Sequence, residues 1–367
     1  MEQWKEYKLG DISNMKYGKL PPKQNNGSYP IWSGYRNVGF ATTYNCRKGT
    51  IIVVARGVGG TGDVKISSED CFLTNLSIAV ELDNKICEPL YFYYKYKLSN
   101  LRYLDTGSAQ SQITIDDLKR LSLKLPPLEE QKRITEILSS IDYNIELNRR
   151  INDNLEQQAQ ALFDHYFDSG SIYLEDSIMG CLTDIAVYLN GLAMQKFPAT
   201  DIERSLPVLK IKELGQRKCD DCSDRCSDSI DADYIIDNED IIFSWSGTLM
   251  VDVWCGGKCG LNQHLFKVTP LKNYPRWFVY YWTNRHLKKF KLIAKDKAVT
   301  MGHIRRGDLE NAEVAIPTNL NMLEINARIN PLFQSIIDRR LEITKLENIR
   351  DALLPKLMSG ELTINEI

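Results

Sequence analysis

No long apolar segment occurs in this sequence. Its longest strand-like apolar run, Ile51–Ala55, has five residues, whereas a helix needs about 18 apolar residues to cross a bilayer. The first ten residues are polar and charged, which predicts that no secretory signal is present. Nine cysteines, an odd number at irregular spacing, indicate reduced thiols rather than a disulfide framework. We therefore expect a cytoplasmic protein without membrane spans.

Motifs of several enzyme classes are also absent. There is no Walker A motif, no nucleophile elbow and no HExxH motif. The Asn/Asp-Pro-Pro-aromatic motif of amino-methyltransferases is missing, and its nearest approach is Asn330-Pro331-Leu332. Gly57–Gly62 matches a dinucleotide-binding fingerprint, but Asp63–Ser67 has the pattern of a second strand where that site needs a helix. These absences predict a binding protein, not an enzyme, with no cofactor of its own.

A metal site has little support in the sequence. The four histidines are scattered, and only Cys219 and Cys222 have CxxC spacing, with Cys226 close behind them. Structural zinc sites use paired CxxC units, and the surrounding acidic residues are expected to raise the pKa values of these thiols. We expect no metal, and keep Cys219, Cys222 and Cys226 as weak zinc candidates.

Positive and negative charges nearly balance, but they are unevenly distributed. The 367 residues contain 46 lysines and arginines against 48 aspartates and glutamates, which excludes a uniformly basic DNA-binding protein. Residues 272–306 nevertheless carry ten basic side chains and one acid, whereas residues 219–240 carry nine acids and one base. The near-neutral total is therefore a cancellation of two strongly charged segments.

The sequence repeats itself once. Leu9–Ile12, followed by Gly18, recurs as Leu182–Ile185, followed by Gly191. Three further matches follow in the same order: Ile51–Gly57 with Ile241–Gly247, Pro89–Tyr96 with Pro275–Trp282, and Ile113–Leu118 with Ile304–Leu309. The length alone suggests two or three domains at roughly 150 residues each. The repeat predicts two similar domains of mixed helix and sheet, each followed by a helix.

Each repeat ends in a long amphipathic segment that follows a proline. After Pro127, apolar residues spaced by three and four run as far as Tyr166, interrupted by two asparagines. The second segment follows Pro317, and Pro355 is expected to end or kink it. A helix of about 40 residues is roughly 60 Å long, so we expect these two helices to pack on each other. A helix that packs only on its own domain is the less favoured alternative.

The basic segment makes nucleic acid the favoured ligand. Lysine and arginine neutralise phosphates, and short polar side chains contact base edges. Trp277, Tyr280 and Tyr281 fall at helical spacing, so we assign them to the core. The corresponding loop of the first repeat, Gly107–Gln112, is neutral but rich in glutamine and serine. The predicted DNA-contacting residues are Arg56, Ser108, Gln110, Gln112, Ser246, Lys295, Lys297, Thr300, His303, Arg305 and Arg306.

Four motifs are distributed along the chain. They are Leu125–Ile134 (LPPLEEQKRI), Glu146–Phe163, Leu261–Val268 (LNQHLFKV) and Arg350–Leu362. Together they resemble the specificity subunit of type I restriction–modification systems, over nearly the whole length. The predicted boundaries are 1–127 for the first globular domain, 128–169 for the first long helix, 170–317 for the second domain and 318–367 for the second helix with its tail.

This resemblance implies an α+β fold with two target-recognition domains, related by a pseudo-two-fold axis and joined by the long helices as an antiparallel coiled coil. Each domain would read one half of a split DNA sequence, while the helices would set the gap and dock two copies of a methyltransferase subunit. S-adenosylmethionine and ATP would bind to partner subunits, which include a motor-nuclease subunit, and this chain would be non-catalytic. The acidic segment 219–240 would face away from DNA or bind a metal. The alternative function is a coiled-coil scaffold that attracts polyanions without sequence preference.

Overall fold

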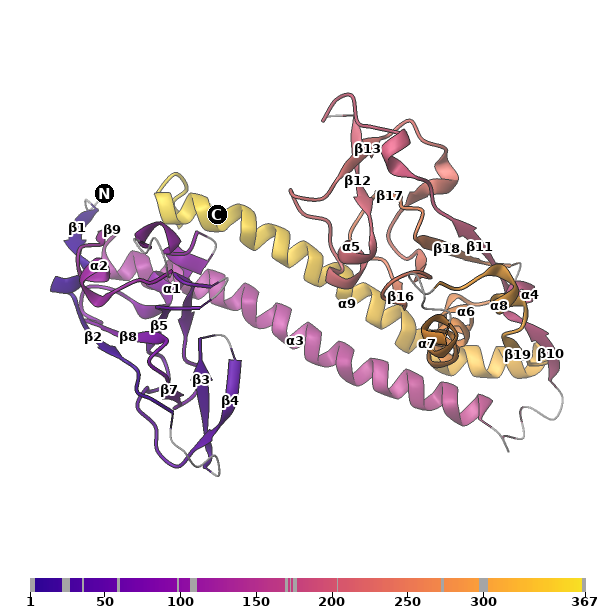
Figure 1. Cartoon of the computed structure of the whole chain (residues 1–367), viewed down its shortest axis with the longest axis horizontal. Helices are drawn as coiled ribbons and strands as arrows, with labels where there is room; N and C mark the ends of the chain where they lie inside the picture. Colours follow the sequence, from indigo (N-terminus) through magenta and orange to yellow (C-terminus); the bar gives the residue numbers. More distant parts are fainter. Residues whose placement is uncertain are drawn as a thin grey trace. The chain divides into compact units, whose positions relative to one another are not determined.

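The chain forms two compact units (Figure 1). Unit 1 comprises Met1–Tyr143 and Glu347–Ile367, and unit 2 comprises Asn144–Leu346. The chain leaves unit 1 through one long helix and returns to it through another, so each long helix contributes residues to both units. This computed structural model describes residues 4–21, 27–34, 36–57, 60–97, 99–105, 111–168, 171, 173, 177–202, 204–271, 274–296 and 303–364.

The described strands of unit 1 form three small sheets. Their bounds are β1 Lys5–Lys8, β2 Ser13–Tyr17, β3 Tyr29–Ser33, β4 Arg36–Ala41, β5 Ile51–Val54, β6 Val64–Ile66, β7 Phe72–Leu73, β8 Ser77–Leu82 and β9 Ser122–Leu125. β1 pairs with β9, and an antiparallel sheet has the order β2-β8-β5-β6. β3 pairs with β4 antiparallel and with β7 parallel. Because β5 and β6 are antiparallel neighbours, the glycine-rich segment between them is a strand connection, as predicted.

Two short helices and both long helices complete unit 1. The short helices are α1 (Pro89–Lys97) and α2 (Ile115–Lys119), with 3-10 turns at Leu9–Asp11 and Arg102–Leu104. α1 buries its aromatic side chains, among them Tyr91 and Phe92, against the four-stranded sheet. Leu138 and Leu357, one from each long helix, belong to the same apolar cluster. The core of unit 1 therefore holds segments from both ends of the chain.

Unit 2 repeats this architecture with insertions. Its strands are β10 Ile178–Cys181, β11 Ala186–Asn190, β12 Ser205–Leu209, β13 Arg225–Ser227, β14 Ile235–Ile236, β15 Ile241–Ser244, β16 Met250–Val253, β17 Cys259–Leu261, β18 Leu265–Pro270 and β19 Glu313–Ile316. Its helices are α4 Leu182–Ile185, α5 Ile211–Gln216, α6 Arg276–Arg285, α7 Leu287–Asp296 and α8 Arg306–Glu310. Trp277 and Tyr281 of α6 are buried, which confirms their assignment to the core.

The two units share one topology. The order β11-β18-β15-β16 in unit 2 repeats β2-β8-β5-β6, the pair β10·β19 repeats β1·β9, and β12 pairs with β17 in parallel as β3 does with β7. In the order of elements, α6 corresponds to α1 and α8 corresponds to α2. The elements β14, α5 and α7 of unit 2 have no counterpart of the same type among the described residues of unit 1. The structure thus confirms the predicted duplication and the α+β class.

A glycine makes the same close approach in each unit. A Cβ atom built on Gly18 would lie 2.2 Å from the Thr74 carbonyl oxygen, and one built on Gly191 would lie 2.2 Å from the Asn262 carbonyl oxygen. The next residues form parallel bridges to the same partners, Lys19 to Thr74 and Leu192 to Asn262. No larger residue fits between these backbones without a shift, which explains why both repeats carry a glycine at this point.

The long helices are α3 (Leu128–Phe167) and α9 (Asn319–Ser359). Pro331 and Pro355 both lie inside α9, so the expectation that Pro355 ends the helix is wrong. Both prolines are exposed, so water can bond the carbonyl groups that lose a helical partner, and the helix continues. Residues of both helices belong to the unit cores, and the boundaries 128–169 and 318–367 stay predictions.

The long helices contact each other within each unit. In unit 1, Arg350 Nη1 donates to Asp142 Oδ1 (2.9 Å). In unit 2, Arg339 Nη1 donates to Asn148 Oδ1 (2.8 Å). Asn148 is one of the two asparagines that interrupt the apolar seam, and it is buried. The seam is therefore held partly by specific polar contacts, which fix the register of two helices more strictly than apolar packing does.

Candidate nucleic-acid interface

In unit 1 the structure brings two predicted DNA-contacting residues together. Arg56 follows β5, Gln112 precedes α2, and the two face each other as an isolated antiparallel bridge. Backbone hydrogen bonds hold this place, from Ile113 N to Ala55 O (3.0 Å) and from Arg56 N to Leu76 O (3.1 Å). Arg56 is exposed and Gln112 is half-buried. A guanidinium-bearing and an amide-bearing residue thus meet beyond the end of one strand.

Unit 2 pairs two predicted residues in the same way. Ser246 follows β15, and it forms an isolated antiparallel bridge with His303. Ile304 N donates to Trp245 O (3.0 Å), which repeats the bond of Ile113 to Ala55. Ser246 therefore corresponds to Arg56, and His303 corresponds to Gln112.

The residue before each bridge differs between the units. Unit 1 has the small Ala55 there, whereas unit 2 has Trp245, whose ring centroid lies 6.0 Å from that of His303 and 6.1 Å from that of His264. Trp245 Nε1 also donates to Asn190 Oδ1 (2.9 Å). An aromatic and imidazole cluster, formed by Trp245, His264 and His303, therefore marks the bridge of unit 2.

Three predicted basic residues lie near the bridge of unit 2 in sequence. Lys295 of α7 is exposed and lines a cavity of about 350 Å³ with Lys291 and the turn Gly247–Leu249, directly after Ser246. Arg305 precedes α8 and is exposed. Arg306 is also exposed, and its Nε lies 3.5 Å from Glu310 Oε1 in the same helix. The structure thus places Lys295 beside the bridge, while Arg306 already has an acidic neighbour.

Four predicted residues lie outside the described part of the chain. They are Ser108, Gln110, Lys297 and Thr300. Their assignment to DNA contact stays a prediction.

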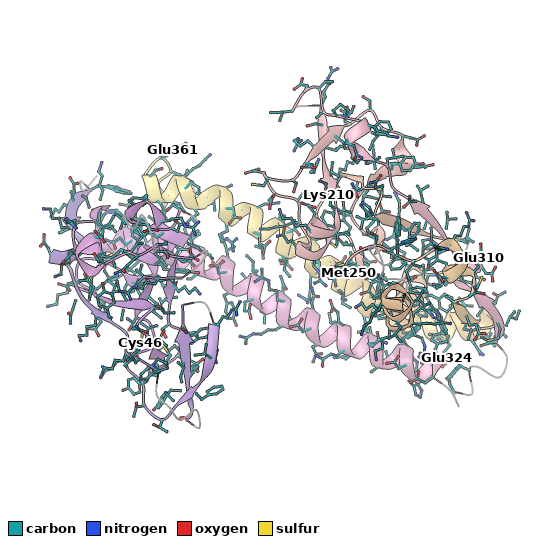
Figure 2. The ribbon with its side chains drawn as sticks, viewed as in Figure 1. Cys46, Lys210, Met250, Glu310, Glu324 and Glu361 are labelled. Atoms are coloured by element: carbon teal, nitrogen blue, oxygen red, sulfur yellow. The ribbon has the colours of Figure 1, made fainter. Side chains whose placement is uncertain are left out.

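A turn that the sequence analysis did not select lies beside this region. Asn262, Gln263 and His264 connect β17 to β18 and line a cavity of about 640 Å³ together with Lys210 and Arg225 (Lys210 is labelled in Figure 2). His264 Nδ1 is buried and has no hydrogen-bond partner among the described residues. Amide, imidazole and cationic groups around one cavity suit contact with bases and phosphates. The motif Leu261–Val268 contained this turn, but it carries no cluster of charge that could have marked it as a contact.

Four of the nine acids in the segment 219–240 form ion pairs with basic residues in the described part of the chain. Lys267 Nζ lies 3.1 Å from Asp240 Oδ2, and Lys212 Nζ lies 3.8 Å from Asp220 Oδ2. Asp224 forms an ion pair with Lys210 and lines the cavity of the 262–264 turn. Part of the acidic segment therefore adjoins the candidate interface, and the expectation that all of it faces away from DNA stays a prediction.

The three candidate zinc ligands have different surroundings. Cys222 is exposed, Cys226 is buried in an apolar cluster, and Cys219 packs against a cluster that contains Cys259. A hydrogen bond with Cys259 lowers the pKa of Cys219 despite the acids nearby, whereas burial raises the pKa of Cys226. The predicted rise is therefore wrong for Cys219. Within the described ranges, no three histidine, cysteine, aspartate or glutamate side chains converge as a metal site would require.

None of the described helices combines the length and the apolar character needed to span a membrane.

Comparison with known proteins places this geometry in a family. Residues 1–157 and 179–350 match the model of the type I restriction modification DNA specificity domain. The MjaIX type I restriction enzyme specificity subunit of Methanocaldococcus jannaschii is 26% identical over 395 residues, which cover 99% of this chain and 89% of that protein. The HindI type I restriction enzyme specificity subunit of Haemophilus influenzae is 50% identical over 56 residues, or 15% of this chain and 12% of that protein.

A solved structure has the same fold. The crystal structure of a type I restriction–modification system S subunit from M. genitalium superposes with a TM-score of 0.66 and covers 96% of both chains. The two sequences are 18% identical, so this likeness concerns the arrangement of elements and not individual contact residues.

Proposed function

This chain belongs to the type I restriction modification DNA specificity family, and from that premise we propose how its two units recognise DNA. The chain is the DNA specificity subunit of a type I restriction–modification system. We infer that each unit reads one half of a two-part duplex target. The long helices α3 and α9 would then set the number of base pairs between the two halves.

One observation carries the division of the target into halves. The bridge Arg56·Gln112 in unit 1 and the bridge Ser246·His303 in unit 2 occupy corresponding places in one repeated topology. A duplicated protein that presents two similar reading surfaces matches a target made of two half-sites, as dimeric DNA-binding proteins do. Because the residues at the two bridges differ, the two halves of the target are expected to differ in sequence.

The side chains at the bridges have the chemistry for base contact. Arginine donates two parallel hydrogen bonds to guanine, and glutamine forms two hydrogen bonds with N6 and N7 of adenine in the major groove. Histidine donates or accepts a single hydrogen bond, and His303 is half-buried, whereas Ser246 is buried and less accessible to a base. Lys295, Lys210 and Arg225 suit phosphate contacts, which position the protein without reading sequence.

The partner subunits complete the activity in this proposal. Two methyltransferase subunits would dock on the chain, one for each repeat, and a motor-nuclease subunit would join them. S-adenosylmethionine and ATP would bind to those partners, and this chain would be non-catalytic. Support comes from the family, whose matched relatives are named specificity subunits, and from the duplication, which offers two equivalent places for one kind of partner. A mass measurement of the assembled complex tests this, and a single methyltransferase copy contradicts it.

The decisive experiment identifies the target first. Long-read methylation sequencing of a host with and without the gene should reveal a split motif that is modified only when the gene is present. A duplex with that motif and two duplexes, each scrambled in one half, then compete for the purified complex. The alternative function, a scaffold that attracts polyanions, predicts equal binding to all three duplexes and a steep dependence on salt.

Two substitutions assign the halves to the units. Gln112→Ala should relax the preference in one half only, and His303→Ala in the other, each by about 1–3 kcal/mol if a base contact is lost. Gln158→Ala, at an exposed position of α3, is the matched control and should leave both preferences unchanged. If both variants relax the same half, the assignment of one half to each unit is wrong.

A further inference from the structure

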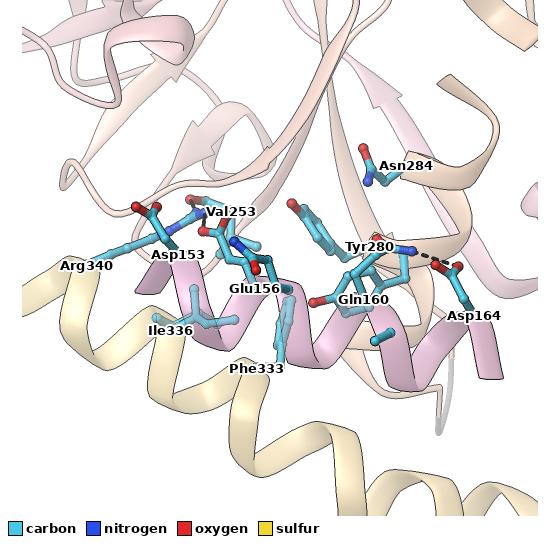
Figure 3. Close-up of a pocket in the computed structure, with 14 residues that line it drawn as sticks. Asp153, Glu156, Gln160, Asp164, Val253, Tyr280, Asn284, Phe333, Ile336 and Arg340 are labelled. Carbon is cyan, nitrogen blue, oxygen red and sulfur yellow. Dashed lines mark hydrogen bonds and ion pairs between the residues drawn. The ribbon is translucent and has the colours of Figure 1, made fainter. Parts of the chain in front are cut away.

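A cavity of about 630 Å³ lies in unit 2 (Figure 3), and it shares no lining residue with the two cavities of the candidate interface. Tyr280 and Tyr281 of α6 and Phe333 of α9 give it aromatic walls. α3 adds the carboxylates of Asp153, Glu156 and Asp164, which Figure 3 shows along one stretch of that helix. Aromatic faces and carboxylates both attract a cation, and together they form the kind of site that proteins use for alkylammonium groups.

The charge within the cavity is only partly neutralised. Arg340 is the cationic side chain among the lining residues; its Nη2 donates to Glu156 Oε1 (2.7 Å), while its Nη1 donates to Asp252 Oδ1 (2.6 Å). Asp164 accepts a hydrogen bond from Gln160 (2.9 Å), and Arg285, outside the lining, lies 3.8 Å from it. Glu156 and Asp164 thus each have an ionic partner, whereas Asp153 has none among the described residues.

The corresponding place in unit 1 holds a cation of the chain itself. Lys97 of α1 donates to Asp142 Oδ2 (2.8 Å), and its Nζ lies 5.5 and 5.4 Å from the ring centroids of Tyr93 and Tyr94. Arg350 donates to the other oxygen of Asp142 (2.9 Å). Two neighbouring tyrosines and a carboxylate therefore surround an ammonium group in unit 1.

The two sequences explain why unit 2 has a cavity at this place. The match of Pro89 with Pro275 would place Tyr94 opposite Tyr280, but burial aligns the two helices one residue further along. Tyr93 and Tyr280 are both half-buried, and Tyr94 and Tyr281 are both buried. In this register Lys97, three residues after Tyr94, corresponds to Asn284, three residues after Tyr281. Asn284 lines the cavity, and its side chain is shorter than that of lysine and neutral. Unit 2 thus keeps the tyrosines and supplies carboxylates from α3, but it lacks the ammonium group.

We propose that this cavity binds an alkylammonium or guanidinium group, and that the group is a lysine or arginine side chain of the methyltransferase subunit. The identity of the partner rests on the proposed function; the chemistry of the cavity does not. The side chain of the partner would take the place that Lys97 fills in unit 1. The methyltransferase copy at unit 2 would then gain a contact that unit 1, where Lys97 fills the site, does not offer to the other copy.

The variant Asn284→Lys tests the site by filling it from within. The new ammonium group should enter the cavity as Lys97 does, raise the thermal midpoint of the free chain, and lower the affinity for the methyltransferase subunit at least tenfold. Gln158→Lys is the matched control, because it adds the same charge at an exposed α3 position outside the cavity lining. The control should change the affinity less than twofold, and circular dichroism should show both variants folded.

A second pair of variants removes charge in place of adding it. Asp153→Asn should weaken binding of the methyltransferase subunit at least threefold, because Asp153 is exposed at the edge of the cavity. Asp338→Asn removes an exposed carboxylate from α9 outside the cavity and should have no effect. Equal effects of the two variants would show that only the overall charge matters and would overturn the site.

Spermidine and n-butylguanidine separate the sources of the cation. Titrated into the complex, either probe should compete with the partner, and neither should bind Asn284→Lys. If the probes bind the wild-type chain but leave the partner affinity unchanged, a free amine is the occupant and the assignment to the partner is overturned. If the probes fail to bind and Asn284→Lys leaves partner affinity intact, the cation site is overturned. Failure of the wild-type chain to bind any methyltransferase subunit would contradict the proposed function instead.

Discussion

The two units share a topology but join their globular part to the long helices in different ways. In unit 1, Asp142 of α3 accepts hydrogen bonds from Lys97, Tyr94 and Arg350. The position in α9 that corresponds to Asp142, relative to the start of each helix, is Phe333. The junction is therefore a charged network in one unit and an aromatic cluster in the other.

This difference bears on the stability and on the geometry of the two junctions. Replacing a buried ion pair by apolar residues is often neutral for stability, whereas removing one partner of such a pair is costly. Both junctions can therefore support the same fold. The charged network fills its space and fixes one geometry, whereas the aromatic junction of unit 2 leaves a cavity, and its nearest buried charge is Arg340.

The largest expected effect comes from Arg340→Met in unit 2. Arg340 is 8% exposed and bridges Glu156 of α3 to Asp252 of β16. Its loss leaves Asp252 buried with Arg217 as its remaining ionic partner, so we expect unit 2 to lose about 3 kcal/mol of stability. Urea unfolding combined with hydrogen exchange at α6 measures this loss.

Arg328→Met is the control for that substitution. Arg328 is also on α9, but it is 62% exposed and lies 3.8 Å from Glu324, a geometry worth less than about 1 kcal/mol. If Arg340→Met is as mild as the control, burial of the arginine does not hold α9 to the sheet, and the aromatic contacts alone join unit 2 to its helices.

The next largest effect is expected from Asp142→Ala in unit 1. The change leaves two mostly buried cations, Lys97 and Arg350, without their shared acceptor, although Arg350 keeps Asp351. We expect a loss of about 2 kcal/mol, read as faster hydrogen exchange in α1. Asp116→Ala removes an exposed carboxylate that lies 3.6 Å from Lys119 and should change stability by less than about 1 kcal/mol.

Acid should weaken unit 1 through the same carboxylate. Burial alone would raise the pKa of Asp142, but hydrogen bonds from Lys97 and Arg350 outweigh burial and hold the pKa below its ordinary value. A carboxylate with a lower pKa in the folded state stabilises the fold above its unfolded pKa of about 3.9, and loses that contribution as the pH falls through the folded value.

Hydrogen exchange at α1, measured from pH 6 to pH 3, checks this sign. Protection should fall below about pH 4 in the wild-type chain, and Asp142→Asn should remove that part of the pH dependence. A wild-type profile identical to that of Asp142→Asn would show that the ionised carboxylate does not hold the junction together.

Much of the fold could be predicted because the repeat shows in short sequence patterns. Gly18 and Gly191 recur because two backbones approach closely at each, and the heptad spacing marks α3 and α9. The end of α9 could not be predicted from Pro355, because the effect of a proline in a helix depends on whether the freed carbonyl group faces water, which the sequence does not show. The short parallel strand pairs β3·β7 and β12·β17 could not be predicted. Each pairs over only two residues, which is too short for a periodic pattern in the sequence.

The candidate interface was only partly predictable. Charge and repeat position predict Arg56, Gln112, Ser246 and His303, and the structure pairs them because corresponding segments occupy corresponding places. His264 was missed as a contact residue because the turn that carries it lies between short strands and shows no excess of charge. Its place beside Trp245 depends on tertiary packing between β15 and β18.

The smallest expected effect comes from Lys295→Ala. It tests whether this lysine of unit 2 contacts a DNA phosphate, in comparison with a lysine of unit 1. Lys295 is exposed beside the turn that follows Ser246. Because a lysine neutralises phosphate without reading bases, Lys295→Ala should lower affinity about threefold for every duplex and reduce the salt slope by about one. Lys124→Ala, at an exposed position of β9 in unit 1, is the matched control. Titrations at several salt concentrations distinguish the roles, since a loss confined to one half of the target would make Lys295 a base-reading residue.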